Sequence, residues 1–315
     1  MDHEGRPRAL LRLAFQYLVF WLATSTFATL VVGGWLAVRA GGDAPDLDPA
    51  ALSGSPALPL VSSVAGLLGA VLSVWLAARF LDRRPVRDLG LGLDRAWWAD
   101  LGFGLLLGAG LISALFGVEL ALGWVSVEGA LATSGTRASF VPALLFPVAT
   151  FLCVGFYEEL IHRGYQIRNA AEGLSGLLGQ RAAVLAAWAL SSAFFGILHA
   201  QNPNATLLST LNISLAGILL GCGYVLTGSL ATPIGLHITW NFFQGAVYGL
   251  PVSGLGPFGA TFLVSRQAGP DLWTGGSFGP EAGLLAPLAM ILGTLLIFLR
   301  ARRARTGVLG LHRTV

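Results

Sequence analysis

Ionisable side chains end or interrupt three otherwise apolar stretches of this sequence, and their types could carry out hydrolysis. The first stretch ends in two adjacent carboxylates followed by an arginine, the second ends in a histidine, and the third carries a histidine with an asparagine four residues later. Hydrolysis of a peptide bond needs an activated water, a base and donors for the oxyanion, and these residue types are compatible with all three roles. The candidate residues are Glu158, Glu159, Arg163, His199, His237 and Asn241.

Helical spacing sorts these groups, because residues four apart share a face while adjacent residues diverge by about 100°. Glu159 and Arg163 are therefore expected to form an ion pair, with the acid on the favourable N-terminal side. Glu158 has no cationic partner in its own helix, although His162 lies one turn beyond it and could form a hydrogen bond with it. Two further pairs share a face in the same way: Phe195 with His199, and His237 with Asn241.

Several of these residues also have a simpler interpretation. The acids at the end of the first stretch could be a solvated flank, and His199, which precedes the loop sequence "AQNPNA", could be an interfacial histidine. Glu119, near the end of another apolar run, is expected to be interfacial. His237 differs, because apolar residues flank it on both sides. An ionisable group inside a membrane span costs about 2.5–3.5 kcal/mol, which favours a function for His237.

The composition indicates that lipid solvates most of the chain. Hydrophobic residues make up 55% and charged residues 11%, whereas soluble domains have about 25% charged residues. The sequence contains no lysine, and its arginines cluster at the ends of apolar runs, where they set membrane orientation. This pattern argues against nucleic acid as a partner. Cys153 and Cys222 lie inside apolar runs and are expected to be small buried residues without a disulfide.

Apolar runs of roughly 20 residues predict transmembrane helices. We expect an all-α, polytopic membrane protein in which about eight helices enclose an intramembrane active site, with residues 1–315 forming a single domain. The predicted spans are 13–38, 58–81, 99–124, 139–160, 181–200, 205–226, 229–250 and 282–300.

The arginines predict that both termini lie in the cytoplasm. The N-terminal flank, the connection "RFLDRRPVRDLGLGLDR" and the C-terminal tail are basic, whereas the loop "GGDAPDLDPAALSGSP" has three aspartates and no basic residue. Segment 251–281 would then lie on the outer side. A composition rich in alanine, glycine and leucine, with arginine as the only strongly basic residue, suggests a bacterial protein of the inner membrane.

Three motifs, taken together and in this order, resemble those of the CPBP family of intramembrane proteases, also called the ABI or CAAX prenyl protease family. The family motifs EExxxR, FxxxH and HxxxN read here as Glu158-Glu159-Leu-Ile-His-Arg163, Phe195-Gly-Ile-Leu-His199 and His237-Ile-Thr-Trp-Asn241. The resemblance covers residues 140–250, which would be the catalytic core. Family members commonly have phenylalanine where this chain has His162.

The resemblance implies an intramembrane endopeptidase that cleaves a membrane-associated peptide or protein. It implies that Glu158 and His199 hold and activate a water molecule, and that His237 and Asn241 stabilise the oxyanion. Glu159 and Arg163 would be an orienting pair. The resemblance does not determine whether the substrate is prenylated.

Three alternatives remain open at the sequence level. Two histidines and a glutamate could bind zinc with an open fourth position, although there is no HExxH helix and the histidines come from different spans. We therefore favour a mechanism without a metal or another cofactor. A proton-coupled transporter could use the same membrane charges, but transporters often show internal repeats, and none is visible here. The third alternative is a non-catalytic, immunity-type membrane protein with the same fold.

A shared site imposes a condition on the fourth helix. If this helix ended at Leu160, Glu158 and His199 would lie about 27 Å apart across the bilayer by helical rise. If it continues through "LIHRGYQIRNAAEG", both residues lie about 20–27 Å from the turn at 171–180 and therefore at one level. The shared site thus predicts one continuous helix of about 30 residues.

Overall fold

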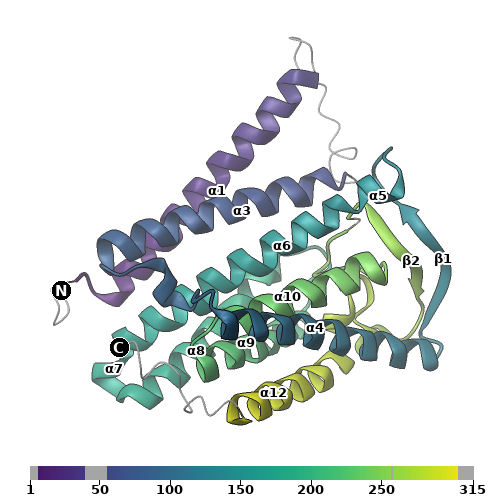
Figure 1. Ribbon diagram of the computed structural model, residues 1–315. Helices are drawn as coiled ribbons and strands as arrows, with labels where there is room; N and C mark the ends of the chain where they lie inside the picture. Colours follow the sequence, from purple (N-terminus) through teal and green to yellow (C-terminus); the bar gives the residue numbers. More distant parts are fainter. Residues whose placement is uncertain (1–5, 40–54, 257, 304–315) are drawn as a thin grey trace.

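The computed structural model describes residues 6–39, 55–256 and 258–303, and most of these residues are helical (Figure 1). Seven helical segments among them are long and apolar enough to cross a membrane, which confirms an all-α, multi-pass integral membrane protein. The acidic loop expected before the second span lies almost entirely outside the described residues. The seven segments are Ala9–Gly34, Ala57–Leu81, Arg95–Ala121, Phe140–Leu178, Gln180–Gln201, Leu207–Thr227 and Leu285–Arg303.

These segments contain several shorter elements in chain order. The first segment is the larger part of α1 (Ala9–Arg39). The second consists of α3 (Ala57–Leu76) and the π-helical turn η1 (Ala77–Leu81), and the third is α4 (Arg95–Ala121). The fourth contains α5 (Phe140–Ala143), α6 (Leu145–Glu159), the π-helix η3 (Leu160–Ile167) and α7 (Arg168–Leu178). The last three contain α8 (Gln180–Leu198) with η4 (His199–Gln201), α9 (Leu207–Thr227) and α12 (Leu285–Arg303).

The long fourth helix required by the sequence is present. One helical segment runs from Phe140 to Leu178, a length of 39 residues. Gly179, whose φ of +71° suits glycine, turns the chain directly into α8, which packs back against α7. Glu158 and His199 lie at nearly equal distances in sequence on either side of this turn, so they come to the same level of the bundle.

The expected seventh span, 229–250, is shorter than predicted. It consists of α10 (Ala231–Phe242), 12 residues long, followed by the five-residue π-helix η5 (Phe243–Val247). Residues 230–237 are all buried, and α10 packs against α4, α6 and α9. Hydropathy alone cannot distinguish a helix surrounded by other helices from one surrounded by lipid, so the apolar run predicted a full span.

A two-stranded antiparallel sheet, which the sequence did not predict, lies at one end of the bundle (Figure 1). Strand β1 (Val125–Thr133) follows α4, and β2 (Ala260–Gln267) comes from the segment after α10. The segment expected to be an outer loop is thus folded, and it also contains α11 (Asp271–Thr274). Glu119 was expected to be interfacial but is fully buried, since α4 runs on into β1 and packs against it.

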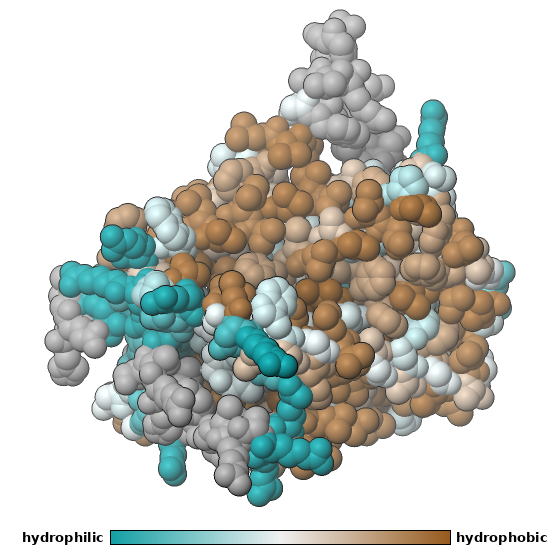
Figure 2. Space-filling model, in the orientation of Figure 1, coloured by the Kyte–Doolittle hydropathy of each residue, from teal (hydrophilic) through white to brown (hydrophobic). Residues whose placement is uncertain are grey.

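The first described helix begins, and α12 ends, at the end of the molecule opposite the sheet (Figure 1). Figure 2 shows a broad hydrophobic surface between the ends, with hydrophilic side chains gathered where α1 begins. The large apolar side chains exposed on α1, α4, α8 and α12 are what a helix bundle presents to lipid. This arrangement is compatible with both termini on one side of a membrane, and the assignment of that side to the cytoplasm stays a prediction.

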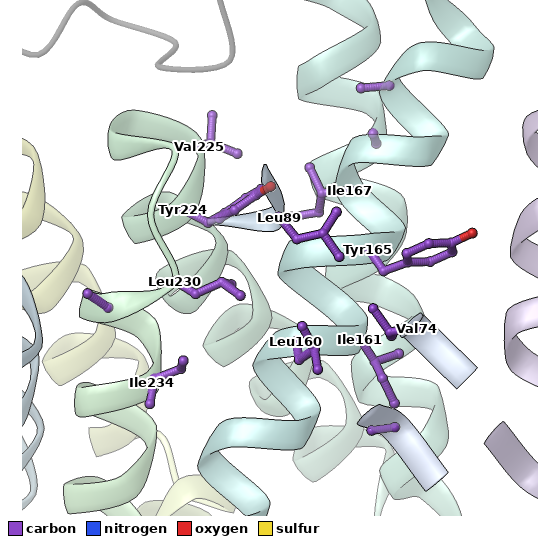
Figure 3. Packing of buried hydrophobic residues seen from close by; sticks show 14 of the residues in the cluster. Val74, Leu89, Leu160, Ile161, Tyr165, Ile167, Tyr224, Val225, Leu230 and Ile234 are labelled. Atoms are coloured by element: carbon purple, nitrogen blue, oxygen red, sulfur yellow. The ribbon is translucent and has the colours of Figure 1, made fainter. Parts of the chain in front are cut away.

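Four apolar side chains of the π-helical segment η3 belong to the main cluster of buried apolar residues. Figure 3 shows its side chains Leu160, Ile161, Tyr165 and Ile167 packed among residues of other elements. Those residues are Val74, Leu89, Tyr224, Leu230 and Ile234. This packing holds the middle of the long helix, and therefore the adjacent Glu158 and Glu159, in a fixed position.

Helices α4 and α10 approach so closely that glycine is needed at their contact. A Cβ atom on Gly104 would lie 2.3 Å from the carbonyl oxygen of Thr232, and one on Gly108 would lie 2.3 Å from that of Leu236. From the other side, a Cβ on Gly235 would lie 2.4 Å from the carbonyl oxygen of Leu101. Small residues at helix contacts are the usual device for close packing in membranes.

We expect Gly108→Ala to lower the unfolding free energy by about 1–3 kcal/mol, the usual cost of overpacking, because backbone atoms must move apart. Gly110→Ala on the same helix is the matched control, since nothing lies within 4 Å of its added Cβ. The control should be neutral or stabilising by up to about 1 kcal/mol, because alanine favours a helix. Thermal unfolding in detergent measures both variants, and equal stability would contradict the close contact.

Candidate active site

The four residues expected to be catalytic line one cavity. This cavity has a volume of about 490 Å³, and Glu158, His199, His237 and Asn241 all contribute to its wall. They come from α6, the start of η4, and α10, so three separate segments of the chain meet there. His162 also lines the cavity. The remaining wall is mostly apolar and comes from α1, α3 and the turn after η5.

Glu158 has the free carboxylate oxygen that a general base needs. Its Oε1 accepts a hydrogen bond from the hydroxyl of Tyr157 at 3.2 Å, while its buried Oε2 has no hydrogen-bond partner among the described residues. That Oε2 lies 3.9 Å from Nε2 of His237. The hydrogen bond considered between Glu158 and His162 is not present, because Nδ1 of His162 lies 2.9 Å from Oε1 of Gln166.

Tyr157 was missed at the sequence level. Its ring stacks on Phe20 of α1, with centroids 6.3 Å apart, and a Cβ on Gly66 of α3 would lie 3.0 Å from the same ring. Two helices distant in sequence thus hold the tyrosine that donates to Glu158. Only the position of Tyr157 beside the acid was visible in the sequence, and it did not reveal these contacts.

The predicted ion pair between Glu159 and Arg163 is present, and it has a further partner. Arg163 Nη1 lies 3.0 Å from Glu159 Oε1, and the two side chains are only 1% and 0% exposed. The same Oε1 lies 2.8 Å from Nδ1 of His237. One carboxylate oxygen therefore joins the long helix to α10, so the pair orients a candidate catalytic histidine in addition to its own helix.

Hydrogen bonding determines which ring nitrogen of each histidine carries the proton. Nδ1 of His199 lies 2.7 Å from the carbonyl oxygen of Phe195, and a carbonyl can only accept, so Nδ1 is the donor. Nδ1 of His237 faces a carboxylate, so the same argument applies. In both neutral rings Nε2 then carries a lone pair. His237 Nε2 becomes a donor only when the ring is protonated.

Phe195 is the packing centre of the site. Its ring centroid lies 4.7 Å from that of His199, 5.2 Å from that of His162 and 6.2 Å from that of His237. The guanidinium carbon of Arg163 lies 4.3 Å from the same centroid, within reach of a cation–π interaction. One phenylalanine therefore contacts all three histidines and the arginine, which gives a physical reason for its place in the FxxxH motif.

The π-helix η3 begins immediately after the paired acids. π-helical turns occur mostly as local insertions in α-helices, often at functional sites. They displace backbone carbonyls from their usual partners, and here the hydroxyl of Ser191 on α8 donates to the carbonyl of His162 at 2.8 Å. The four-residue pair of Glu159 with Arg163 is kept across the start of η3, whereas His162 pairs with Gln166 and not with Glu158.

The expectation of a metal-free site stays a prediction. Among the described residues, no group of three or more histidine, cysteine, aspartate or glutamate side chains is gathered closely enough to hold one ion. Cys153 and Cys222 are free thiols, as expected, but only Cys222 is buried, since Cys153 is half-buried, and neither lines the cavity. The mechanism below therefore uses no metal.

Removing Arg163 should destabilise the protein strongly, because it leaves the carboxylate of Glu159 buried without its cation. We expect Arg163→Met to lower the unfolding free energy by about 3–5 kcal/mol. The matched control is Arg266→Met, which breaks the exposed pair with Glu128, whose side chains are 64% and 47% exposed. The control should cost at most about 1 kcal/mol. Denaturant titration in detergent measures the unfolding free energy of both variants. An equally small decrease in Arg163→Met and Arg266→Met would contradict this role.

Comparison with known proteins supports the resemblance. Residues 140–243 match the model of the family described as "Type II CAAX prenyl endopeptidase Rce1-like". The chain is also 26% identical to the uncharacterized protein YyaK of Bacillus subtilis strain 168 over 233 residues, which cover 72% of this chain and 73% of YyaK. No solved structure matches the chain significantly.

The family match spans α5 to the first residue of η5 and includes every residue of the three motifs. The helices that complete the cavity wall, α1 and α3, lie outside it. The resemblance predicted from the three motifs is therefore confirmed as a match: residues 140–243 of this membrane protein match the model of the Rce1-like CAAX prenyl endopeptidase family.

Proposed function

We propose that this protein is an intramembrane endopeptidase that hydrolyses a peptide bond of a membrane-associated peptide or protein through a water molecule activated by Glu158. The single observation that carries the proposal is the shared cavity, whose wall contains Glu158, two imidazoles and one amide, while Oε2 of Glu158 has no partner among the described residues. A carboxylate without a cationic partner is suited to accept a proton. The family match adds independent support, because its description names an endopeptidase.

The geometry suggests where the water is held. Glu158 Oε2 and His237 Nε2 lie 3.9 Å apart, which is too far for a direct hydrogen bond and suits a water molecule that is hydrogen-bonded to both. The water donates one proton to Glu158, and Nε2 of His199 can accept the other, because the Nδ1 proton of His199 is committed to the carbonyl of Phe195. Glu158 takes one proton of the water as its oxygen attacks the substrate carbonyl.

The resulting oxyanion needs donors, and the site offers two. The side-chain amide of Asn241 donates directly. His237 donates from Nε2 when its ring has taken up a second proton from solvent before the attack, and the carboxylate of Glu159 at Nδ1 stabilises that imidazolium. Glu158 then transfers its proton to the leaving amine as the C–N bond breaks, which regenerates the carboxylate. Glu159 and Arg163 act through His237 and do not contact the reacting atoms.

The apolar part of the cavity wall favours a substrate that is partly embedded in lipid. Phe20 and Trp21 of α1 and Leu58 of α3 line the same cavity as the polar groups. A prenylated C-terminal peptide and an unmodified membrane-associated peptide would both suit this mixture. We further propose that the protein resides in the bacterial inner membrane with both termini in the cytoplasm.

Replacing Glu158 tests the mechanism directly. We expect Glu158→Gln to lower kcat by about 10²–10⁴-fold, the usual contribution of a general base, with the fold intact. Purified protein would be assayed on farnesylated Cys-Ala-Ala-X peptides and on unprenylated membrane-associated peptides. Glu128→Gln, at an exposed carboxylate of β1, is the matched control and should retain wild-type kcat. Full cleavage by Glu158→Gln would exclude the proposed base, and no cleavage by the wild type would favour a non-catalytic partner protein.

Metal removal separates the two chemistries considered for this site. Because the described side chains do not gather around one ion, we expect full activity after treatment with 1,10-phenanthroline. Elemental analysis of the same active preparation should find zinc well below one atom per chain. Stoichiometric zinc, with activity lost on chelation and restored by zinc, would overturn the metal-free mechanism.

A further inference from the structure

A tight turn after η5 projects into the candidate active site. Val252 and Leu255 exchange two backbone hydrogen bonds of 3.0 and 2.9 Å, and the two residues between them, Ser253 and Gly254, have φ angles of +50° and +76°. These features define a two-residue turn of the I′ type. Glycine adopts positive φ readily, whereas a serine in this region costs about 1–2 kcal/mol.

Ser253 is held in this unfavourable conformation by a buried acid. Glu281 is only 4% exposed, and its Oε1 accepts hydrogen bonds from the backbone N–H of Ser253 and, at 3.1 Å, from its hydroxyl. The Oε2 atom of Glu281 accepts from the amide of Gln244. The carbonyl of Ser253 accepts from the amide of Asn202 at 3.0 Å, which joins the turn to the loop after His199.

The position of Ser253 places it beside the catalytic groups. It lines the large cavity with Glu158, and it also lines a smaller cavity of about 50 Å³ together with His199, His237 and Asn241. Ser253 is thus at the boundary of the two spaces that border the proposed reacting atoms. Neither Ser253 nor Glu281 lies in the segment that matches the family model.

The contacts of the Ser253 hydroxyl leave it as an acceptor towards the cavity. A hydroxyl has one proton and two lone pairs, and here the proton is donated to Glu281. Burial raises the pKa of Glu281, but the hydrogen bonds that it receives from Ser253 and Gln244 favour its ionised form. The lone pairs of Oγ are the part of Ser253 that remains available. The commonest donor in a peptide substrate is a backbone N–H.

We propose that Ser253, positioned by Glu281, is a substrate-binding residue whose Oγ accepts a hydrogen bond from a backbone N–H of the bound peptide close to the scissile bond. This contact sets the register of the peptide against Glu158. The inference rests on the proposed function. A turn with only a structural role would show no preference for one particular substrate N–H.

A set of depsipeptides tests the contact. In each, one amide other than the scissile bond is replaced by an ester, which removes a single N–H from the best-cleaved peptide of the panel. At one position, we expect the wild type to lose roughly tenfold in kcat/KM at pH 8, as for one hydrogen bond. Ser253→Gly should cleave the parent peptide roughly tenfold more slowly than the wild type and should lose nothing further at that position.

Ser253→Gly also controls for folding, because glycine suits the positive φ of this turn. Its thermal stability in detergent should equal or exceed that of the wild type. If Ser253→Gly is stable and shows the same ester-to-amide ratio as the wild type at every position, the contact is excluded. If the wild type cleaves none of the peptides, the proposed function fails instead, so the two failures are distinguishable.

Two substitutions of Glu281 test whether this acid positions Ser253. Glu281→Ala removes the oxygen that accepts both hydrogen bonds from Ser253, so we expect a higher KM and the loss of the ester discrimination. Glu281→Gln keeps one acceptor oxygen and should restore part of that discrimination, which a general loss of stability would not do. Wild-type discrimination in Glu281→Ala would show that the turn does not depend on this acid.

Discussion

The carboxylate of Glu159 is the interaction on which the candidate site depends. It is fully buried, and one of its oxygens contacts both the guanidinium of Arg163 and Nδ1 of His237. A buried carboxylate is tolerated only when nearby groups compensate its charge and satisfy its hydrogen bonds. That requirement joins the long helix to α10, and it also sets the tautomer and direction of the His237 ring. The contacts that compensate the charge of Glu159 are therefore the same contacts that orient His237 in the candidate site.

The apolar packing around this contact makes it rigid. The π-helix η3 lies in the main core cluster directly after Glu159, and the ring of Phe195 packs against Arg163 and the three histidines. In a low-dielectric interior such contacts hold polar groups in place without competition from water. Glu158 and Glu159 each have a second oxygen without a partner among the described residues, and Glu158 differs from Glu159 in lining the cavity.

The helices and turns outside the family match complete the cavity. Phe20 of α1 and Gly66 of α3 hold the ring of Tyr157, whose hydroxyl contacts Glu158. The segment after α10 supplies β2, the turn at Ser253 and the buried Glu281. The wall of the cavity thus combines motif residues with residues of these flanking segments.

Sequence alone predicted the elements that depend on local rules. Apolar runs located seven spanning helices, the four-residue spacing predicted the pair of Glu159 with Arg163, and helical rise predicted the long continuous helix. The three motifs named Glu158, His199, His237 and Asn241, which all line the cavity. These features follow from periodicity and hydrophobic length, which each segment carries by itself.

Only the tertiary structure decided the rest. The contact of His237 with Glu159 joins residues far apart in the chain, and the pairing of β1 with β2 crosses more than a hundred residues. The short length of α10 and the burial of Glu119 depend on which other segments surround them. The hydropathy of a segment contains no information about its neighbours in the fold. The pairing of His162 with Gln166 in place of Glu158 is likewise visible only in the folded chain. Local spacing could identify the chemical groups, but the mutual orientation of these groups is a property of long-range packing.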